Sequence, residues 1–149
     1  MGRLLESNRY VRCVIIDFSK AVDTVNHEIL LKKLQQFSIP GNILNWIVSF
    51  LTDRSQATRV NSVCSLPLAI TRSIVQGSVT GPYAFIAYVS DCKTRSLLNF
   101  ILEYADDFNL LVPENNEDEM QHIMSWSAAT NKLSINLSKS KELFFGDLV

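Results

Sequence analysis

The sequence has few cysteines and no long hydrophobic run, and these two scarcities exclude several classes of protein. Three cysteines occur in 149 residues, at Cys13, Cys64 and Cys92. They are odd in number and widely spaced, so we expect neither a disulfide framework nor a zinc site. No apolar stretch approaches the roughly 20 residues that a membrane-spanning helix needs, and the first ten residues hold no apolar signal-peptide segment. We therefore expect an intracellular protein, in the cytoplasm or nucleus, that is neither secreted nor membrane-bound.

The chain also lacks a strong excess of charge of either sign. It has 14 Lys and Arg against 15 Asp and Glu, a net charge of −1, so no general affinity for polyanions follows from the charge. This balance hides an asymmetry, because residues 1–75 carry nine basic and five acidic side chains while residues 76–149 carry five and ten. Hydrophobic residues make up 47% of the sequence, enough to bury a core. The length predicts a single domain over residues 1–149.

Hydrophobic periodicity predicts an α+β domain with an antiparallel sheet and helices packed on one face. The expected strands cover residues 11–17, 57–60, 66–71, 99–104, 108–112 and 142–145. The expected helices cover residues 26–37, 43–53, 83–97 and 114–133.

Three acidic residues beside apolar strands give the strongest chemical signal. Asp106 and Asp107 form the tip of a predicted hairpin, and Asp17 ends the first predicted strand. Adjacent carboxylates repel one another unless a positive charge lies between them, and their hard oxygen atoms suit Mg²⁺. Adjacent acids in a turn are also common as solvated residues, so the spacing alone leaves both interpretations open.

Five sequence blocks occur in order along the chain: Ile16–His27, Trp46–Gln56, Gln76–Pro82, Tyr104–Asp107 and Leu133–Ser140. In this order and at these separations, they resemble the palm of a reverse transcriptase from a non-LTR (LINE-type, jockey-like) retrotransposon. The resemblance covers about residues 11–145. It implies a polymerase palm-like antiparallel sheet, with the fingers and thumb largely missing from this stretch.

The resemblance implies an RNA-directed DNA polymerase that performs two-metal nucleotidyl transfer onto a primer 3′-hydroxyl. Its implied partners in the complete enzyme are an RNA template, a DNA primer and deoxynucleoside triphosphates, and its implied cofactor is a pair of Mg²⁺ ions, with Mn²⁺ as the alternative ion. The residues implied to bind metal are Asp17, Phe18 (through its carbonyl), Asp106 and Asp107. Lys139 matches the lysine that protonates the leaving pyrophosphate. The residues implied to contact nucleotide or template are Val22, Gln76, Gly77 and Ser78.

Several positions leave a second interpretation open. Val22 stands where the family has an aromatic residue that excludes a ribose 2′-hydroxyl, and Ser73 begins a stretch that replaces Gly-Val-Pro. Asp23 and His27 match the family, but local helix capping explains them equally well. Gln76 also fits a loop amide that caps the helix after it.

Three function classes follow from this sequence. The first is a reverse transcriptase domain that is incomplete by itself. The alternatives are a catalytically inactive retrotransposon-derived remnant and a different palm-type two-metal enzyme such as a nucleotide cyclase. A metal titration separates the first two.

Overall fold

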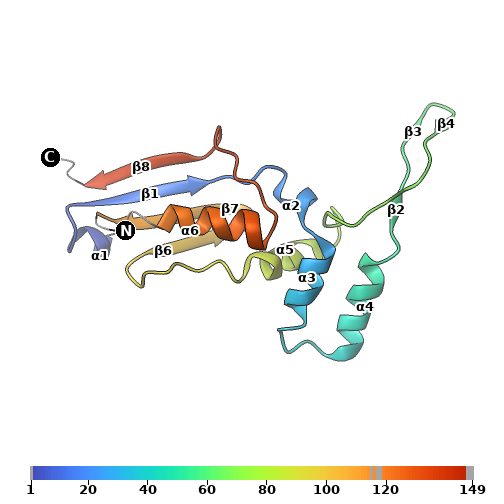
Figure 1. Cartoon of the computed structure of the whole chain (residues 1–149), viewed down its shortest axis with the longest axis horizontal. Coiled ribbons are helices and arrows are strands. Elements are labelled where there is room, and N and C mark those ends of the chain that lie inside the picture. Colours follow the sequence, from blue (N-terminus) through green and yellow to red (C-terminus); the bar gives the residue numbers. More distant parts are fainter. Residues whose placement is uncertain (1, 115, 117–118, 147–149) are drawn as a thin grey trace. The chain divides into compact units, whose positions relative to one another are not determined.

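The computed structural model describes residues 2–114, 116 and 119–146 (Figure 1). The chain packs as two compact units. Unit 1 comprises residues 1–21 and 89–149, and unit 2 comprises residues 22–88. A single domain over the whole chain stays a prediction.

Unit 1 is built on a four-stranded sheet in the order β6-β7-β1-β8. These strands are β1 (Tyr10–Ile16), β6 (Phe100–Tyr104), β7 (Asp107–Pro113) and β8 (Lys141–Gly146). Every neighbouring pair is antiparallel. The predicted antiparallel sheet is therefore confirmed, and each of its four strands lies within two residues of its expected position.

The two faces of this sheet are covered differently. Helix α6 (Glu119–Ser125) continues as a short π-helix, η1 (Trp126–Thr130), and in Figure 1 the ribbon labelled α6 overlies the sheet and runs along its strands. The buried side chains of Ile123 in α6 and Trp126 in η1 join the core, as expected for helices on one face. On the other face, Leu4 and Leu5 of helix α1 (Gly2–Leu5) pack against the β1 and β7 residues Val11, Cys13 and Leu111.

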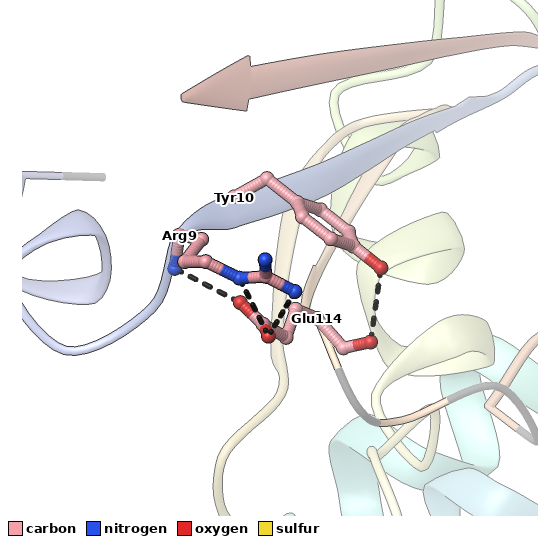
Figure 2. Close-up of polar contacts among 3 residues, drawn as sticks. All are labelled: Arg9, Tyr10 and Glu114. Carbon is pink, nitrogen blue, oxygen red and sulfur yellow. Dashed lines mark hydrogen bonds and ion pairs between the residues drawn. The ribbon is translucent and has the colours of Figure 1, made fainter. Parts of the chain in front are cut away.

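A polar contact joins the start of β1 to the end of β7 (Figure 2). Glu114 accepts hydrogen bonds from the backbone amide of Arg9 at 3.0 Å and from its guanidinium Nε at 3.3 Å. The Tyr10 hydroxyl donates to the Glu114 carbonyl at 3.1 Å. Because a one-residue slip would separate all these groups, the contact helps to fix the register of β1 against β7.

Unit 2 combines short helices with a long hairpin-like excursion. Its helices are α2 (Ala21–Thr24), α3 (His27–Leu34), α4 (Gly41–Leu51) and α5 (Gly81–Val89), of which the first and last reach one residue into unit 1. The excursion carries the pairs β2 (Ser55–Gln56) with β5 (Leu68–Ala69) and β3 (Arg59–Val60) with β4 (Val63–Cys64). Buried Lys33 ties α3 to α5, since its ammonium group donates to the Tyr88 carbonyl and lies 5.1 Å from the centre of the Tyr88 ring.

The structure corrects two expected helices and one hairpin. Helix α5 ends at Val89 rather than at residue 97, because the following loop is bound to α6 and η1 instead. In that loop, Asp91 accepts from the Trp126 indole at 3.1 Å, and Arg95 donates its amide to the buried Glu119 carboxylate at 2.8 Å. The predicted hairpin over residues 57–60 and 66–71 divides into the two separate ladders of unit 2.

The helix expected over residues 114–133 starts at Glu119 and ends, as η1, at Thr130. Positions 115, 117 and 118 of that expected helix lie outside the described residues. No helix in the described part of the chain has both the length and the apolar character to cross a membrane.

Candidate active site

The strand register brings the three predicted metal-binding acids to one end of the unit 1 sheet. Ile16 of β1 pairs with Phe108 of β7, so Asp17 comes opposite Asp107 one residue further along. Tyr104 pairs with Asp107 as the last rung of the β6–β7 hairpin, which leaves Asp106 in its two-residue turn. Opposed residues of an antiparallel pair lie roughly 5 Å apart at Cβ. Asp17 and Asp107 directly adjoin the last pair of the ladder, Ile16 and Phe108, although 90 positions separate the two acids in the sequence.

Side-chain alternation puts these acids on the accessible face of the sheet. Successive residues in a strand point to opposite faces, so Asp17 and Asp107 lie opposite the face that buries Ile16 and Phe108. Tyr104, the cross-strand neighbour of Asp107, is 82% exposed. A ligand can therefore reach this end of the sheet.

An aromatic cluster underlies the acids on the buried face. The Phe18 ring lies edge-on to Phe108, with 5.1 Å between ring centres and an interplanar angle of 88°. Trp126 lies 6.5 Å from Phe18 and 6.2 Å from Phe108. Phe18 follows Asp17 and Phe108 follows Asp107, so packing between the two rings holds the acid-bearing strand ends together.

The block Leu133–Ser140 binds the backbone on both sides of Asp17. The Asp17 amide donates to Ser140 Oγ at 3.1 Å, and the Asp17 carbonyl accepts from the Asn136 amide at 2.7 Å. The Ser19 amide donates to the Ser134 carbonyl at 2.8 Å. These last two hydrogen bonds form an isolated β-bridge between Phe18 and Ile135. They use backbone groups of the residues on either side of Phe18, so the Phe18 carbonyl takes no part in the bridge.

Lys139 sits on the same segment, and its side chain is exposed. Its amide donates to the Asn136 carbonyl at 3.1 Å, in the turn whose Ser140 hydroxyl contacts Asp17. The backbone of the predicted proton donor is therefore held next to the backbone of the first predicted metal ligand.

The acids at this end of the sheet carry the hard oxygen atoms that magnesium prefers. Among the described residues, no group of three or more Asp, Glu, His or Cys side chains is arranged to hold a metal ion. Magnesium is usually held by one or two carboxylates, with water and substrate phosphate oxygens filling its octahedron. The opposed acids Asp17 and Asp107, with Asp106 in the adjoining turn, supply carboxylates of this kind.

The turn that carries Asp106 contains a strained residue. Ala105 has a φ of +55°, as the first position of a two-residue hairpin turn requires. Residues with a Cβ atom rarely adopt this conformation, which costs of the order of 1–2 kcal/mol. We therefore expect Ala105→Gly to stabilise the fold by about 1 kcal/mol, after the larger unfolded-state entropy of glycine is subtracted.

Thermal unfolding tests this expectation, since about 1 kcal/mol corresponds to a rise in Tm of about 2–4 °C at this chain length. Ala57→Gly is the matched control, because Ala57 is exposed and has no positive φ. The control should lower Tm slightly. Equal losses in both variants would show that Ala105 is not strained.

Glu103 lies on the helix-covered face, opposite Phe108 in the register of β6 and β7. Burial of its carboxyl group, together with the negative charge of Asp91, raises the pKa of Glu103 to about 7. The native state then holds a proton that the unfolded state releases at lower pH. The stability contributed by this proton is complete below about pH 4.5 and is lost as the pH rises through 7.

Glu103→Gln should abolish this loss between pH 4.5 and 7.5. The residue as a whole is exposed, so solvent screening limits the effect to about 1 kcal/mol. Urea unfolding at several pH values measures it, with the exposed Glu6→Gln as a control that keeps the wild-type slope. If Glu103→Gln follows the wild-type curve, the raised pKa is wrong.

The residues predicted to bind nucleotide or template belong to unit 2, whereas the predicted metal ligands and Lys139 belong to unit 1. Within unit 2, the Val22 carbonyl accepts from the Ile74 amide at 3.1 Å. Gln76 and Gly77 are exposed and Ser78 is half-buried, and Gly77 has a φ of +78°. The Ser78 hydroxyl donates to the Val75 carbonyl at 2.7 Å, so this loop is braced from within.

In the structure, the side chains of Asp23, His27 and Gln76 make contacts other than the helix caps considered for them. Asn26 caps α3, because its side chain accepts from the Ile29 amide. His27 is buried, and its Nε2 atom lies 2.7 Å from the Ser73 carbonyl. A carbonyl can only accept, so Nε2 carries the proton. Asp23 accepts from the Gln76 side-chain amide at 3.1 Å.

Sequence reasoning assigned no role to two residues that position the site, Asn136 and Ser140. Both belong to the Leu-x-x-Asn-x-x-Lys-Ser pattern of the fifth block. The signal was their fixed spacing around Lys139, but the strand that they bind lies more than 110 positions away in the sequence.

The chain is similar to curated proteins of mobile elements. It is 28% identical over 117 residues to the probable RNA-directed DNA polymerase from transposon BS of Drosophila melanogaster, which covers 74% of this chain and 13% of that protein. It is 25% identical over 158 residues to the RNA-directed DNA polymerase from the mobile element jockey of the same organism. This match covers 96% of this chain and 17% of the jockey protein. The chain thus spans less than a fifth of these relatives.

Solved structures with the same fold include telomerases. The telomerase of Candida tropicalis, in complex with a fragment of telomeric RNA, matches with a TM-score of 0.74 at 14% sequence identity. The match covers 96% of this chain and 28% of the telomerase chain. This likeness supports the expected palm-like α+β fold. The family model described as "Reverse transcriptase (RNA-dependent DNA polymerase)" matches residues 2–145. The chain therefore belongs to the reverse transcriptase family.

Proposed function

We propose that this chain is the palm of a non-LTR retrotransposon reverse transcriptase, and that the complete protein copies an RNA template into DNA from a primer 3′-hydroxyl. The observation that carries the proposal is the β1–β7 register, which ends at Ile16 and Phe108 and so brings Asp17 and Asp107 to one end of the sheet, beside the β6–β7 turn. Two sequence blocks of the family thereby meet at one accessible sheet end. If the hairpin acids were only solvated turn residues, the fold would not need to bring the first and fourth sequence blocks together.

Asp17, the Phe18 carbonyl and Asp106 would hold two Mg²⁺ or Mn²⁺ ions, with Asp107 in support. Bound there, the ions would supply the positive charge that activates the primer hydroxyl and stabilises the leaving pyrophosphate. Lys139 would donate the proton that the pyrophosphate takes up on leaving. Val22, Gln76, Gly77 and Ser78 would contact the incoming nucleotide and the template strand.

A chimera tests the proposal, because the chain spans only part of its relatives. In the jockey polymerase, the matching segment is replaced by residues 11–145 of this chain. We expect Mg²⁺-dependent extension of a DNA primer on an RNA template with deoxynucleoside triphosphates. The unmodified jockey polymerase is the control. A chimera that folds and binds primer-template but extends nothing would instead identify an inactive remnant.

Val22 allows a prediction on substrate choice in the same chimera. A phenylalanine here would occupy the space of a ribose 2′-hydroxyl, and valine is smaller by several heavy atoms. We expect Val22→Phe to raise the kcat/KM ratio for deoxynucleotides over ribonucleotides by about 10- to 100-fold, a typical yield of steric rejection. Equal ratios in the two versions would show that Val22 does not contact the sugar.

A further inference from the structure

A polar cavity in unit 2 joins three sequence blocks, one of which has no role in the proposed mechanism. The cavity has a volume of about 430 Å³, and its polar wall consists of Asp23, His27, Arg54, Gln56, Ser73 and Gln76. Arg54 and Gln56 come from the Trp46–Gln56 block, and the rest come from the first and third blocks and the residues just before the third. A cavity built from these blocks points to a ligand-binding role for its wall.

One hydrogen bond in this wall fixes the orientation of an amide. Gln76 Nε2 donates to Asp23 Oδ1 at 3.1 Å. An ionised carboxylate accepts hydrogen bonds but donates none, so Asp23 pairs with the amino end of the Gln76 amide and not with its carbonyl end. Gln76 Oε1 is then the end of the amide that Asp23 leaves for another donor.

The backbones that carry these two side chains are themselves tied together. The amides of Ser73 and Ile74 donate to the carbonyls of Val25 and Val22, at 2.8 and 3.1 Å. The buried His27 ring donates to the Ser73 carbonyl. These contacts hold Ser73 at a φ of +88°, a conformation that a residue with a Cβ atom keeps when its surroundings enforce it. These hydrogen bonds therefore hold the backbone segments that carry Asp23 and Gln76 next to each other.

We propose that Asp23 is a positioning residue that orients the Gln76 amide so that Oε1 accepts a hydrogen bond from the sugar or base of the incoming nucleotide. This rests on the proposed function, which has Gln76 contact the nucleotide. Phosphate oxygens at neutral pH are acceptors, so a carbonyl oxygen in this place favours the hydroxyl and N–H donors of the nucleoside over the triphosphate.

The test uses the 149-residue chain and two readouts by NMR. The first is the order parameter of the Gln76 side-chain NH₂ group. Asp23→Ala should lower it from the rigid range of about 0.8 to below about 0.6. Glu28→Gln, an exposed acid on α3, is the matched control and should leave it unchanged. An unchanged order parameter in Asp23→Ala overturns the inference, whatever the chain does as a polymerase.

The second readout is the Kd for thymidine triphosphate with Mg²⁺, followed through the Gln76 signals. Asp23→Ala should weaken binding about fivefold, as expected when one hydrogen bond loses its fixed geometry. Asp23→Asn is the sharper variant, because an amide can donate or accept and so keeps Gln76 rigid without selecting its orientation. It should hold the wild-type order parameter and still weaken binding by about two- to threefold.

The outcomes separate this inference from the proposed function. If thymidine triphosphate binds Asp23→Asn and Asp23→Ala as tightly as the wild type, Asp23 does not position Gln76 and the inference is overturned. If the wild-type chain itself shows no shift at Gln76 with the nucleotide, the nucleotide role of Gln76 in the proposed function fails, and with it the ligand part of the inference. The order parameter then still decides whether Asp23 fixes the amide.

Discussion

Asp106→Asn in the chimera is expected to reduce primer extension by about 1,000-fold. The acid lies in the turn between β6 and β7, next to the opposed pair Asp17 and Asp107. Asparagine keeps the shape of the side chain but removes the negative charge that would hold a divalent ion. Metal ions stabilise transition-state charge by several kcal/mol, and each 1.36 kcal/mol is a tenfold change in rate.

Steady-state primer extension on an RNA template measures this loss, in an assay that resolves rates over about four orders of magnitude. Glu142→Gln is the control, since Glu142 is an exposed acid of β8 that forms an ion pair with Arg12. The control should extend within about twofold of the parent chimera. An Asp106→Asn chimera that retains a tenth of the parent rate would contradict a metal-binding role for this carboxylate.

Phe108→Ala is expected to destabilise unit 1 by about 3–5 kcal/mol, the usual cost of truncating a fully buried phenylalanine. Phe108 is 0% exposed and packs edge-on against Phe18. The change would leave a cavity beneath the two strand ends that carry Asp17 and Asp107. Small domains are stable by only about 5–15 kcal/mol, so the variant should lose a large part of its stability.

Urea unfolding followed by circular dichroism measures the loss. Phe100→Ala is the matched control on the same sheet, because Phe100 is 48% exposed, and it should cost about 1 kcal/mol or less. If Phe108→Ala costs no more than Phe100→Ala, the aromatic cluster does not hold the acid-bearing ends together.

The sheet could be predicted from the sequence because its strands carry local signals. β-Branched runs and the predicted Ala105–Asp107 turn indicated strands at the right places, although Asp107 proves to be the first residue of β7. Asp17 at a strand end suggested a partner for the hairpin acids. What the sequence could not supply is the register, because the pairing of Ile16 with Phe108 joins residues 92 positions apart. Such a pairing depends on the whole face that the sheet buries rather than on local preference.

The errors arose where tertiary contacts override local preference. The apolar run after Gly81 ends at Val89, but the predicted helix was carried on through the mostly polar residues 90–96 to Leu97. Asp91 instead bonds the Trp126 indole, and buried Glu119 takes the amides of the loop that follows. A buried carboxylate must have donors, and the loop provides them at the expense of helical turns.

Backbone conformation at two positions was also out of reach. Ala105 and Ser73 have positive φ values of +55° and +88°, and neither residue type signals this. The family pattern has a glycine where Ser73 stands, which is the residue expected at such a conformation. Ser73 therefore departs from the family pattern at a position whose positive φ favours glycine.

The most direct test of the central claim is paramagnetic broadening of backbone amide signals by substoichiometric Mn²⁺ in the 149-residue chain. We expect the signals of Asp17, Asp106 and Asp107 to be lost first in the wild type, and no such selective loss in Asp106→Asn. Broadening that is the same in both proteins, or that centres on the acids of the opposite face, Asp91 and Glu103, would contradict this expectation.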